Sequence, residues 1–482
     1  MKSPKRSVNS SIGSYQSSRV YKKAITSDIL QNSVDYEGVA KNPVIVVHGF
    51  LGAHLKNSKT GRDVWGSFTG IDAIRGYSNK ELQELSLPMQ QKKTLGELKD
   101  NIVPTEFLST FDINLFGVHF QRDAYDKLLD ILTEAGYCRE DRPLPNKKKS
   151  LSLFTFYYDW RRDLPENALK LHAFILEKRA YIQEKYKELF NVDKYDVHFD
   201  FLAHSMGGLL SRYYLRYGTQ NLPADTSLPN LDWAGSKYMD KLFIIGTPNA
   251  GYLDTCTEMI NGLQIANHAP FYPPAIIGTF HSYYQMMPLL ENRQLVYTDD
   301  PNGKPVDIYD PQTWIDLNWG LADPKQDKYL KILLPNISLK SERRKIAIDH
   351  LTKCLKRAKQ FTQAMRVYYN SSKHKPSNLS EYLFLGDAVK TRQTATVNRK
   401  TGKIKISTYG AGDGKVLASS ARMDEPNAKK WKPFVISPIK WDAVIHLRAA
   451  HMGITAGDGF VHNLLYYLLA VPPKNYTSRG NK

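Results

Sequence analysis

The sequence has only three cysteines in 482 residues, and this scarcity limits the kind of protein that it can encode. Cys138, Cys256 and Cys354 are odd in number and far apart, which argues against a disulfide framework and favours a reducing compartment. No stretch reaches the 18 apolar residues of a membrane span, and the basic, serine-rich N-terminus lacks the apolar core of a signal peptide. We therefore expect a cytoplasmic or peripheral membrane location, with export by a signal-independent route left open.

The sequence also lacks the spacings typical of nucleic-acid-binding modules, although it is strongly basic. It has 66 Lys and Arg against 48 Asp and Glu, which gives a formal charge of +18. Such a charge favours acidic partners, either nucleic acid or an anionic membrane surface. Because zinc-finger, RNP-like and helix-turn-helix patterns are absent, we expect no nucleic-acid partner and predict peripheral contact with an anionic membrane. No feature of the sequence indicates its oligomeric state.

What the sequence does contain is a strand, a serine and a helix in immediate succession. Residues 197–203 are a β-branched and aromatic run typical of a buried strand, and residues 208–217 have helical spacing. A serine on so sharp a turn needs small neighbours two residues before and after it, and Ala203 and Gly207 meet this need. The pattern predicts a nucleophile elbow, G-x-S-x-G with alanine in the first position, and Ser205 as the nucleophile.

A second signal lies near the start of the predicted core. The apolar run at residues 43–47 leads into the sequence HGFLG at residues 48–52. In serine hydrolases of the α/β type, an HG-containing loop after an early strand supplies one donor of the oxyanion hole. We predict that the N–H groups of Phe50 and Met206 form this hole. A glycine-rich loop can also hold a phosphate, but the Lys-Ser/Thr ending of a P-loop is missing.

A serine hydroxyl is a poor nucleophile alone, so the elbow requires a base and an orienting acid elsewhere in the chain. Asp413, set among glycines at residues 410–414, is the candidate acid. The alternative interpretation of Asp413 is an ordinary Asx turn, for which Asp-Gly is a common sequence.

Histidines 446, 451 and 462 follow a last predicted strand at residues 434–438. His451 fits best the loop before the closing helix at 460–471, where this fold places its base. His446 directly follows an apolar run, and His462 falls inside the helix, so both are weaker candidates. The resulting order of serine, acid and histidine is that of α/β-hydrolases.

Strands and helices alternate along the first half of the chain, which predicts an α/β fold with a doubly wound, mostly parallel sheet. The expected elements are strands at 43–47, 151–158, 197–203, 241–246 and 382–386, helices at 122–135, 165–190, 208–217 and 341–365, and a hairpin at 394–408. The helix at 341–365 carries a basic surface. It is interpreted either as a helix lying on anionic lipid or as a cap helix with a solvated basic side.

Two long insertions interrupt this alternation. The first directly follows the oxyanion loop and is typical of a lid, and the second is large enough to be a cap that walls the active site. The expected organisation is a flexible basic arm at 1–40, the first part of the hydrolase core at 41–251 with the lid at about 53–120, the cap at 252–378, the second part of the core at 379–473 and a C-terminal tail at 474–482.

With these residues in view, the chain resembles the lecithin:cholesterol acyltransferase-like family of α/β-hydrolases, which includes lysosomal-type phospholipase A and phospholipid:diacylglycerol acyltransferases. The resemblance spans roughly residues 43 to 470, and YDWR is its most specific motif. The motifs that carry it are PVIVVHGFLG (43–52), GYCRE (136–140), YDWR (158–161), AHSMGG (203–208), GTPNAG (246–251), SYYQMMP (282–288), DPQTW (310–314) and GAGDGKV (410–416).

The resemblance implies an α/β-hydrolase fold with a lid and a cap, and acyl-ester chemistry on lipids without a metal or organic cofactor. It assigns the nucleophile to Ser205, the acid to Asp413 and the base to His451. This chain departs from the family pattern at Ala203, where glycine is usual, and at Lys415, where threonine is usual. It also lacks the lid cysteines and the secretion signal of secreted members, so the expectation covers the chemistry but not a secreted setting.

Three functions follow from these observations. The first is a serine-dependent lipid acyl hydrolase or O-acyltransferase that acts on glycerolipids or phospholipids through an acyl-enzyme. The second keeps the same triad in a lipase or esterase without acyltransferase activity. The third, from another class, is a non-catalytic lipid-surface or nucleic-acid-binding protein built on a hydrolase fold.

Overall fold

The computed structural model describes residues 28–36, 38–66, 78–108, 110–115, 118–123, 125–264, 271–367, 374–424 and 436–474. Most of the expected N-terminal arm, part of the lid segment and all but the first residue of the C-terminal tail therefore lie outside the described residues.

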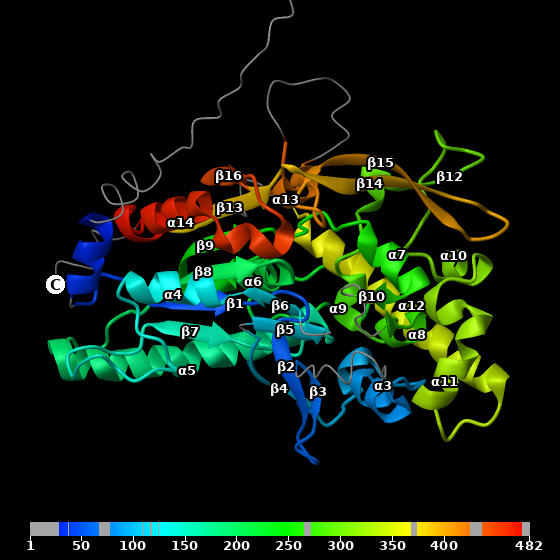
Figure 1. Cartoon of the computed structure of the whole chain (residues 1–482), viewed down its shortest axis with the longest axis horizontal. Helices are drawn as coiled ribbons and strands as arrows, with labels where there is room; N and C mark the ends of the chain where they lie inside the picture. Colours follow the sequence, from blue (N-terminus) through cyan, green and yellow to red (C-terminus); the bar gives the residue numbers. More distant parts are fainter. Residues whose placement is uncertain are drawn as a thin grey trace, which may run out of the picture.

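Six parallel strands form the central sheet, in the order β16-β13-β9-β8-β1-β7 (Figure 1). Their bounds are β1 Val44–Val47, β7 Leu153–Phe156, β8 Phe199–His204, β9 Met239–Ile245, β13 Ser380–Gly386 and β16 Ala443–Leu447. Every residue of the four inner strands is buried, as expected for parallel strands that are covered on both faces. The predicted α/β fold with a mostly parallel sheet is confirmed.

Helices cover both faces of the sheet because successive side chains of a strand point to opposite sides. In β1, Val44 and Val46 pack in one apolar cluster and Ile45 and Val47 in the other. The first cluster contains side chains of α4 (Asp126–Glu134) and α14 (Asp458–Leu465), and the second contains those of α5 (Leu164–Phe190) and α6 (Met206–Tyr217). The two helical layers bury the sheet and leave the ends of its strands for the site.

The lid segment, residues 53–120, folds into small antiparallel sheets and a helix. Its elements are β2 Ala53–Asn57, β3 Asp63–Trp65, α3 Asn79–Leu85, β4 Ile102–Phe107, and β5 Thr110–Leu115, which pairs with β6 Val118–Asp123. A capping box starts α3, because the side chains of Ser78 and Glu81 each bond the other residue's backbone N–H. Helix α3 contacts α11 (Asp327–Leu333), so the lid segment lies against the cap segment.

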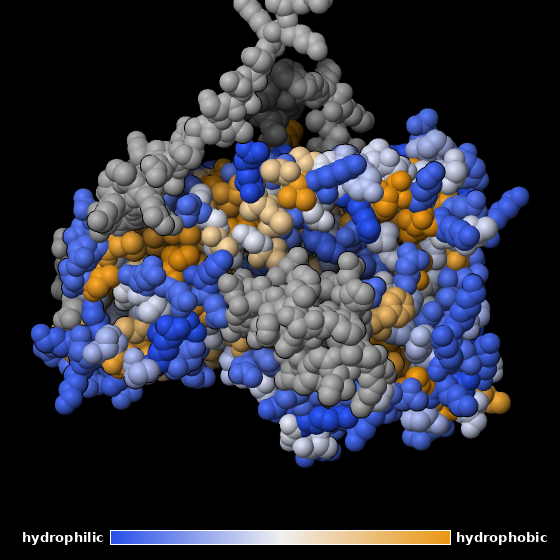
Figure 2. All heavy atoms as spheres, viewed as in Figure 1, coloured by the Kyte–Doolittle hydropathy of each residue, from blue (hydrophilic) through white to orange (hydrophobic). Residues whose placement is uncertain are grey.

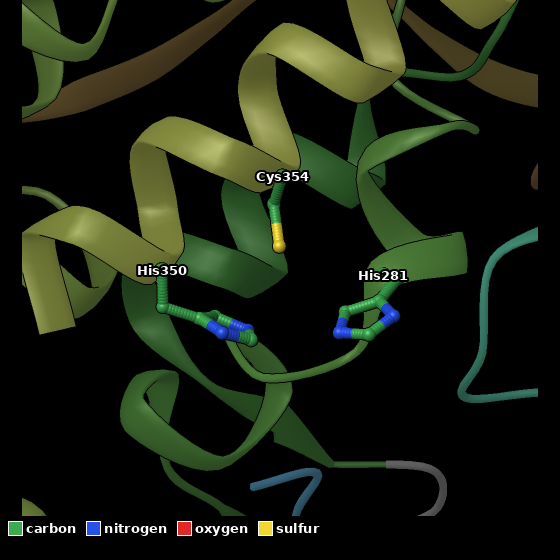
Figure 3. A group of neighbouring side chains, drawn as sticks. All are labelled: His281, His350 and Cys354. Carbon is green, nitrogen blue, oxygen red and sulfur yellow. The ribbon is translucent and has the colours of Figure 1, made fainter. Parts of the chain in front are cut away.

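The cap segment, residues 252–378, is mainly helical and lies beyond one end of the central sheet (Figure 1). Its other elements are α7 Asp254–Asn261, β10 Leu263–Gln264, β11 Phe271–Tyr272, α8 Pro274–Ile277, α9 His281–Tyr284, β12 Leu295–Tyr297, α10 Pro311–Asp316 and α12 Lys340–Met365. Helix α12 packs against α9, where the ring of His350 lies 5.4 Å from that of His281 between centroids (Figure 3).

The predicted hairpin forms from β14 (Val389–Val397) and β15 (Ile404–Gly412), but it does not join the central sheet. Strand β14 pairs instead with β12 of the cap segment, in parallel register. The hairpin therefore links the second part of the core to the cap segment, and β15 delivers the chain to Asp413.

Two predicted elements are wrong in position. The helix expected at 122–135 begins only at Asp126, because the residues before it pair as β6. The last strand of the sheet is β16 and not residues 434–438, of which 434 and 435 lie outside the described residues. As an edge strand, β16 is mostly half-exposed, and its apolar run of three residues before His446 is shorter than the run that marks a buried strand.

Helix α12 is the predicted basic helix, and its apolar side faces the protein. Its apolar residues Ile346, Leu351, Leu355 and Phe361 are buried in the main core, so this face is not available to lipid. Of its basic residues, Lys345, Lys356 and Lys359 are exposed, whereas Arg343 and Arg357 are paired with Asp327 and Asp163. Figure 2 shows a largely hydrophilic surface on one side of the molecule, broken by a hydrophobic area over α14. Within the described residues, no helix combines the length and apolar character needed to span a bilayer.

Candidate active site

Ser205 lies on a strained turn between β8 and α6. Its φ of 53° and ψ of −125° place an L-residue in a sparsely populated region, which the surrounding packing must hold. The N–H of Ser205 donates to the carbonyl of Ile245 at 2.8 Å, and its own carbonyl accepts from Thr247 Oγ1 at 2.8 Å. These bonds to β9 and to the residues after it fix the turn.

The residues around Ser205 must be small because neighbouring backbone and side-chain atoms lie too close for larger ones. A Cβ on Gly207 would lie 2.4 Å from the carbonyl oxygen of His48, and one on Gly208 would lie 2.0 Å from Thr247 Oγ1. On the opposite side, a Cβ on Gly49 would lie 2.8 Å from Ser205 Cβ. Glycine at these positions lets α6 and the loop after β1 approach the serine closely.

The structure brings the three predicted residues together at the carboxyl end of the sheet. His451 Nε2 lies 3.0 Å from Ser205 Oγ, and His451 Nδ1 lies 2.7 Å from Asp413 Oδ2. The backbone N–H of His451 also donates to the carbonyl of Asp413 at 2.8 Å. The imidazole is therefore held between an alcohol and a carboxylate, each within hydrogen-bond distance.

Asp413 is held as a carboxylate by its surroundings. Oδ1 accepts the N–H groups of Lys415 at 2.9 Å and Val416 at 2.7 Å, so the residue makes an Asx turn and also faces His451 with Oδ2. Burial alone would raise its pKa, but the charge and hydrogen bond of His451, together with these N–H groups, lower the pKa below its usual value. The two interpretations of Asp413 are thus compatible.

The other candidate histidines lie outside this arrangement. His446 is on β16 itself, half-exposed, and its Nδ1 lies 2.7 Å from Asp387 Oδ2. His462 lies within α14. Neither has a hydrogen bond to the serine, so His451 is the histidine that the structure places on Ser205.

A hydrogen-bonded chain that the sequence did not predict connects the serine turn to the loop after β1. The Tyr125 hydroxyl accepts the N–H of Gly49 at 2.9 Å and lies 2.9 Å from His204 Nδ1, while His204 Nε2 lies 3.3 Å from the carbonyl oxygen of His451. Burial, with a smaller contribution from His451, lowers the pKa of His204 to about 3, so its ring stays neutral. No local pattern marks Tyr125, because its partners are distant in sequence.

Phe50 and Met206, whose N–H groups are predicted to form the oxyanion hole, stand in the loop after β1 and at the start of α6. Met206 is the first residue of α6, so its N–H belongs to the unpaired, positive end of that helix. Phe50 follows Gly49, which contacts Ser205, and its ring packs at 4.8 Å from that of Tyr283 and 4.9 Å from that of Trp160 between centroids. The aromatic contacts anchor the loop that carries its N–H group.

Tyr158 of the YDWR motif supports the same loop from the other side. Its ring stacks on that of His48 at 4.2 Å, its N–H donates to His48 Nε2 at 3.2 Å, and its hydroxyl donates to the His48 carbonyl at 3.0 Å. Because Nε2 accepts, Nδ1 carries the proton and donates to the Gly49 carbonyl at 2.7 Å. The motif therefore holds the loop in position against Ser205.

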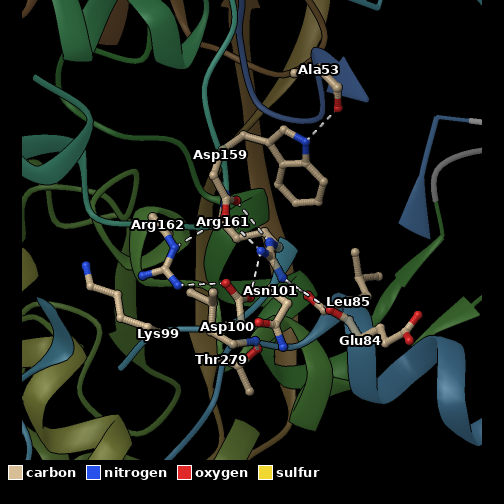
Figure 4. A network of polar contacts seen from close by, with 12 residues as sticks. Ala53, Glu84, Leu85, Lys99, Asp100, Asn101, Asp159, Arg161, Arg162 and Thr279 are labelled. Carbon is tan, nitrogen blue, oxygen red and sulfur yellow. Dashed lines mark hydrogen bonds and ion pairs between the residues drawn. The ribbon is translucent and has the colours of Figure 1, made fainter. Parts of the chain in front are cut away.

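The remaining residues of the motif form a buried polar network that joins the core to the lid segment (Figure 4). The Arg161 guanidinium is fully buried and donates to Asp159 at 2.7 and 2.9 Å, to Asp100 at 2.9 Å and to the Leu85 carbonyl at 2.9 Å. Trp160 donates its indole N–H to the carbonyl of Ala53 at 3.1 Å. Because both Asp100 and Leu85 belong to the lid segment, YDWR fastens this segment to the core.

Lys415, where the family usually has threonine, connects the loop of Asp413 to the cap segment. Its Nζ donates to Asp254 Oδ2 at 3.1 Å and Glu258 Oε1 at 3.0 Å, both on α7. Glu258 also accepts the hydroxyl of Tyr283, whose ring packs against Phe50. Lys415 thus provides an ionic link between the loop of Asp413 and α7.

We expect Lys415→Met to lower the free energy of unfolding by about 1–2 kcal/mol at pH 7, because Glu258 stays buried without its cation. Burial already raises the pKa of Glu258, with Lys415 opposing it, so the variant raises that pKa further. When the pKa of a carboxyl group is higher in the folded than in the unfolded chain, the group lowers the free energy of unfolding once the pH rises above its unfolded pKa of about 4.3. The free energies of unfolding of variant and wild type, measured in urea, should therefore differ less at pH 4 than at pH 7. A difference that is constant from pH 4 to 7 would contradict the link between Lys415 and the ionisation of Glu258.

A parallel sheet with a serine on its strand-to-helix turn, and with a histidine and an acid on later loops, defines the class as an α/β-hydrolase. Residues 104–301 match the family model described as lecithin:cholesterol acyltransferase. A comparison with curated proteins gives no match. Among solved structures, a chain in the crystal structure of the Tle4–Tli4 complex is similar, with a TM-score of 0.53 and 14% identity over 92% of this chain and 100% of that chain.

At this identity the structural likeness shows the fold alone. The match over residues 104–301 is consistent with a lecithin:cholesterol acyltransferase-like α/β-hydrolase and supports an enzyme that hydrolyses or transfers the acyl groups of lipid esters.

Proposed function

We propose that Ser205, His451 and Asp413 are a catalytic triad, and that the enzyme acts on glycerolipids or phospholipids through an acyl-enzyme. The single observation that carries this proposal is the position of His451, whose two ring nitrogens lie 3.0 Å from Ser205 Oγ and 2.7 Å from Asp413 Oδ2. A histidine held in this way can take a proton from the serine on one side while the carboxylate stabilises the resulting cation on the other.

The reaction begins with attack of Ser205 Oγ on the carbonyl carbon of the lipid ester, while His451 takes the hydroxyl proton. The N–H groups of Phe50 and Met206 hold the negative oxygen of the tetrahedral intermediate. The intermediate then breaks its bond to the lipid alcohol, which leaves with the proton from His451. Water or an acceptor hydroxyl, deprotonated in turn by His451, releases the acyl group from Ser205.

Asp413→Asn should lower kcat about 10⁴-fold, because an amide in this position favours the wrong tautomer of His451 and does not stabilise its cation. The rate of hydrolysis of a short-chain ester, with circular dichroism to check the fold, measures the effect. The matched control is Asp387→Asn, which removes the carboxylate at 2.7 Å from His446 outside the site and should leave kcat unchanged. A loss smaller than about tenfold for Asp413→Asn would remove this residue from the triad.

The lipid products decide between hydrolysis and acyl transfer. The wild type and Ser205→Ala are incubated with vesicles that contain a phospholipid, an anionic lipid and, in one series, a lipid alcohol acceptor. Mass spectrometry of the products should show serine-dependent transfer of an acyl chain to the acceptor if the enzyme is an O-acyltransferase. Free fatty acid alone, in both series, would identify a lipase or esterase, and no product dependent on Ser205 would refute the proposal.

The anionic lipid belongs in this experiment because the chain carries a formal charge of +18, which favours approach to a negatively charged membrane surface. Contact with such a surface would bring the site to its lipid ester.

A further inference from the structure

Three buried side chains of the cap segment, which the proposed reaction does not use, meet in the protein interior: His281, His350 and Cys354 (Figure 3). One ligand atom from each lies within 4.8 Å of the other two. His281 begins α9, while His350 and Cys354 are four residues apart on α12 and therefore share one face of that helix. Of the residues that the structure describes, these alone form such a group of metal-ligand side chains.

The two imidazoles leave three nitrogen atoms without partners. Both ring nitrogens of His281 and Nδ1 of His350 are buried and have no hydrogen bond. Each buried polar atom left unpaired costs about 1–3 kcal/mol, so three of them at one place are unusual in a native interior. A metal ion that accepts the lone pair of one nitrogen from each ring would remove this cost at two of the three atoms.

The ring of His350 is oriented in the manner of a metal ligand. Its Nε2 lies 3.3 Å from the carbonyl oxygen of Thr279, so Nε2 carries the proton and Nδ1 keeps its lone pair. Metal-binding histidines almost always donate their other N–H to a carbonyl or carboxylate in this way. Thr279 is itself fixed, because its hydroxyl donates to the Ile276 carbonyl at 2.7 Å and accepts the N–H of Leu87 at 3.1 Å.

Figure 3 shows the sulfur of Cys354 and one nitrogen of His281 pointing toward the space between the three side chains. When a metal ion lies in the plane of three donor atoms, bonds of about 2.0 Å to nitrogen and 2.3 Å to sulfur put the donor atoms about 3.5–3.8 Å from one another. Small side-chain rotations, of about 1 Å at the donor atoms, would bring the three ligands to that separation.

We propose that His281, His350 and Cys354 bind one Cu(I) ion, which fastens α9 to α12. Thiolate and imidazole are the donors that soft copper and zinc prefer, and a trigonal set of two histidines and one cysteine is typical of protein copper sites. Zn²⁺ takes four ligands in structural sites and would leave a net positive charge here. Cu(I) on one thiolate is neutral, which matters because an uncompensated charge is costly to bury. On binding, the Cys354 thiol loses its proton to solvent, and sulfur bonds to the metal without any change in oxidation state.

The location gives the ion a structural role in the wall of the active site. The neighbouring Ser282 donates its hydroxyl to the carbonyl of Trp160, and Tyr283 of the same helix packs against Phe50. By holding α9 on α12, the ion would stabilise the surface on which the YDWR motif and the oxyanion loop rest.

Metal content tests the proposal without reference to ester turnover. The full chain is purified anaerobically under reducing conditions, titrated with Cu(I) against a chromogenic Cu(I) chelator, desalted and assayed by elemental mass spectrometry. We expect about one copper per chain in the wild type and a loss of at least tenfold in occupancy in Cys354→Ala and His350→Ala. The matched control is Cys256→Ala, which removes another fully buried free thiol and should retain the copper.

Thermal unfolding gives a second measurement, in which each protein is compared with itself in the presence and absence of Cu(I). Cu(I) should raise the Tm of the wild type and of Cys256→Ala by at least about 3 °C and leave that of Cys354→Ala unchanged. Wild-type protein that binds no copper, that binds Zn²⁺ and not Cu(I), or that loses no copper on removal of Cys354 would overturn the proposal. None of these outcomes depends on whether Ser205 is the nucleophile.

Discussion

Ser205→Ala is expected to lower ester turnover by about 10⁵- to 10⁶-fold and to leave the fold intact. The loss is this large because no other group takes the place of the attacking oxygen, and members of a triad act as a unit. The residual rate would come from the oxyanion donors and from substrate binding. Steady-state hydrolysis of a short-chain ester, measured with variant and wild type at equal folded concentration, gives the ratio.

Ser211→Ala is the matched control for this variant. Ser211 lies on α6, six residues after Ser205, and its hydroxyl is fully buried without a hydrogen-bond partner. Removing this hydroxyl should therefore leave both turnover and the free energy of unfolding nearly unchanged. Comparable losses in the two variants would show that disturbance of α6, and not loss of the nucleophile, lowers the rate.

Arg161→Met is expected to have the largest effect on stability, about 3–5 kcal/mol in the free energy of unfolding. The guanidinium is fully buried, and its removal leaves Asp159 and Asp100 with one arginine, Arg162, in place of two. It also leaves the Leu85 carbonyl without the donor at 2.9 Å that holds it in the lid segment. Urea unfolding followed by tryptophan fluorescence measures the difference from wild type.

Arg142→Met provides the control on an exposed ion pair. Arg142 lies 3.1 Å from Asp130, and each side chain is 52% exposed, so solvent and salt screen the pair. We expect a change of less than about 1 kcal/mol. If Arg161→Met were no more destabilising than Arg142→Met, the YDWR motif would not be the anchor of the lid segment.

Residues that are marked by their immediate neighbours in the sequence could be predicted. Ser205 stands on a turn that demands small neighbours, and the strand before it and the helix after it are marked by their own periodicity. His451 and Asp413 carry weaker signals: the glycines around Asp413, the loop before the closing helix for His451, and the order of the motifs along the chain. The structure places His451 within hydrogen-bond distance of both Ser205 and Asp413, and their catalytic roles stay a prediction.

Features that depend on contact between distant segments were not predictable. Tyr125 bonds Gly49 and His204, which lie 76 and 79 residues away, so no window of sequence contains the arrangement. The pairing of β12 with β14 and the meeting of α9 with α12 at His281 depend in the same way on tertiary packing. The edge strand β16 was missed because its apolar run is only three residues long and most of its residues are only partly buried.

Covalent labelling is the most direct measurement of the central claim, that Ser205 is an activated nucleophile. The full chain is treated with a fluorophosphonate, and the modified peptide is mapped by mass spectrometry. The account predicts one adduct per chain, on Ser205, which is absent from Ser205→Ala and forms far more slowly in His451→Gln. A folded protein that shows no adduct, or an adduct on another serine that persists in Ser205→Ala, would contradict it.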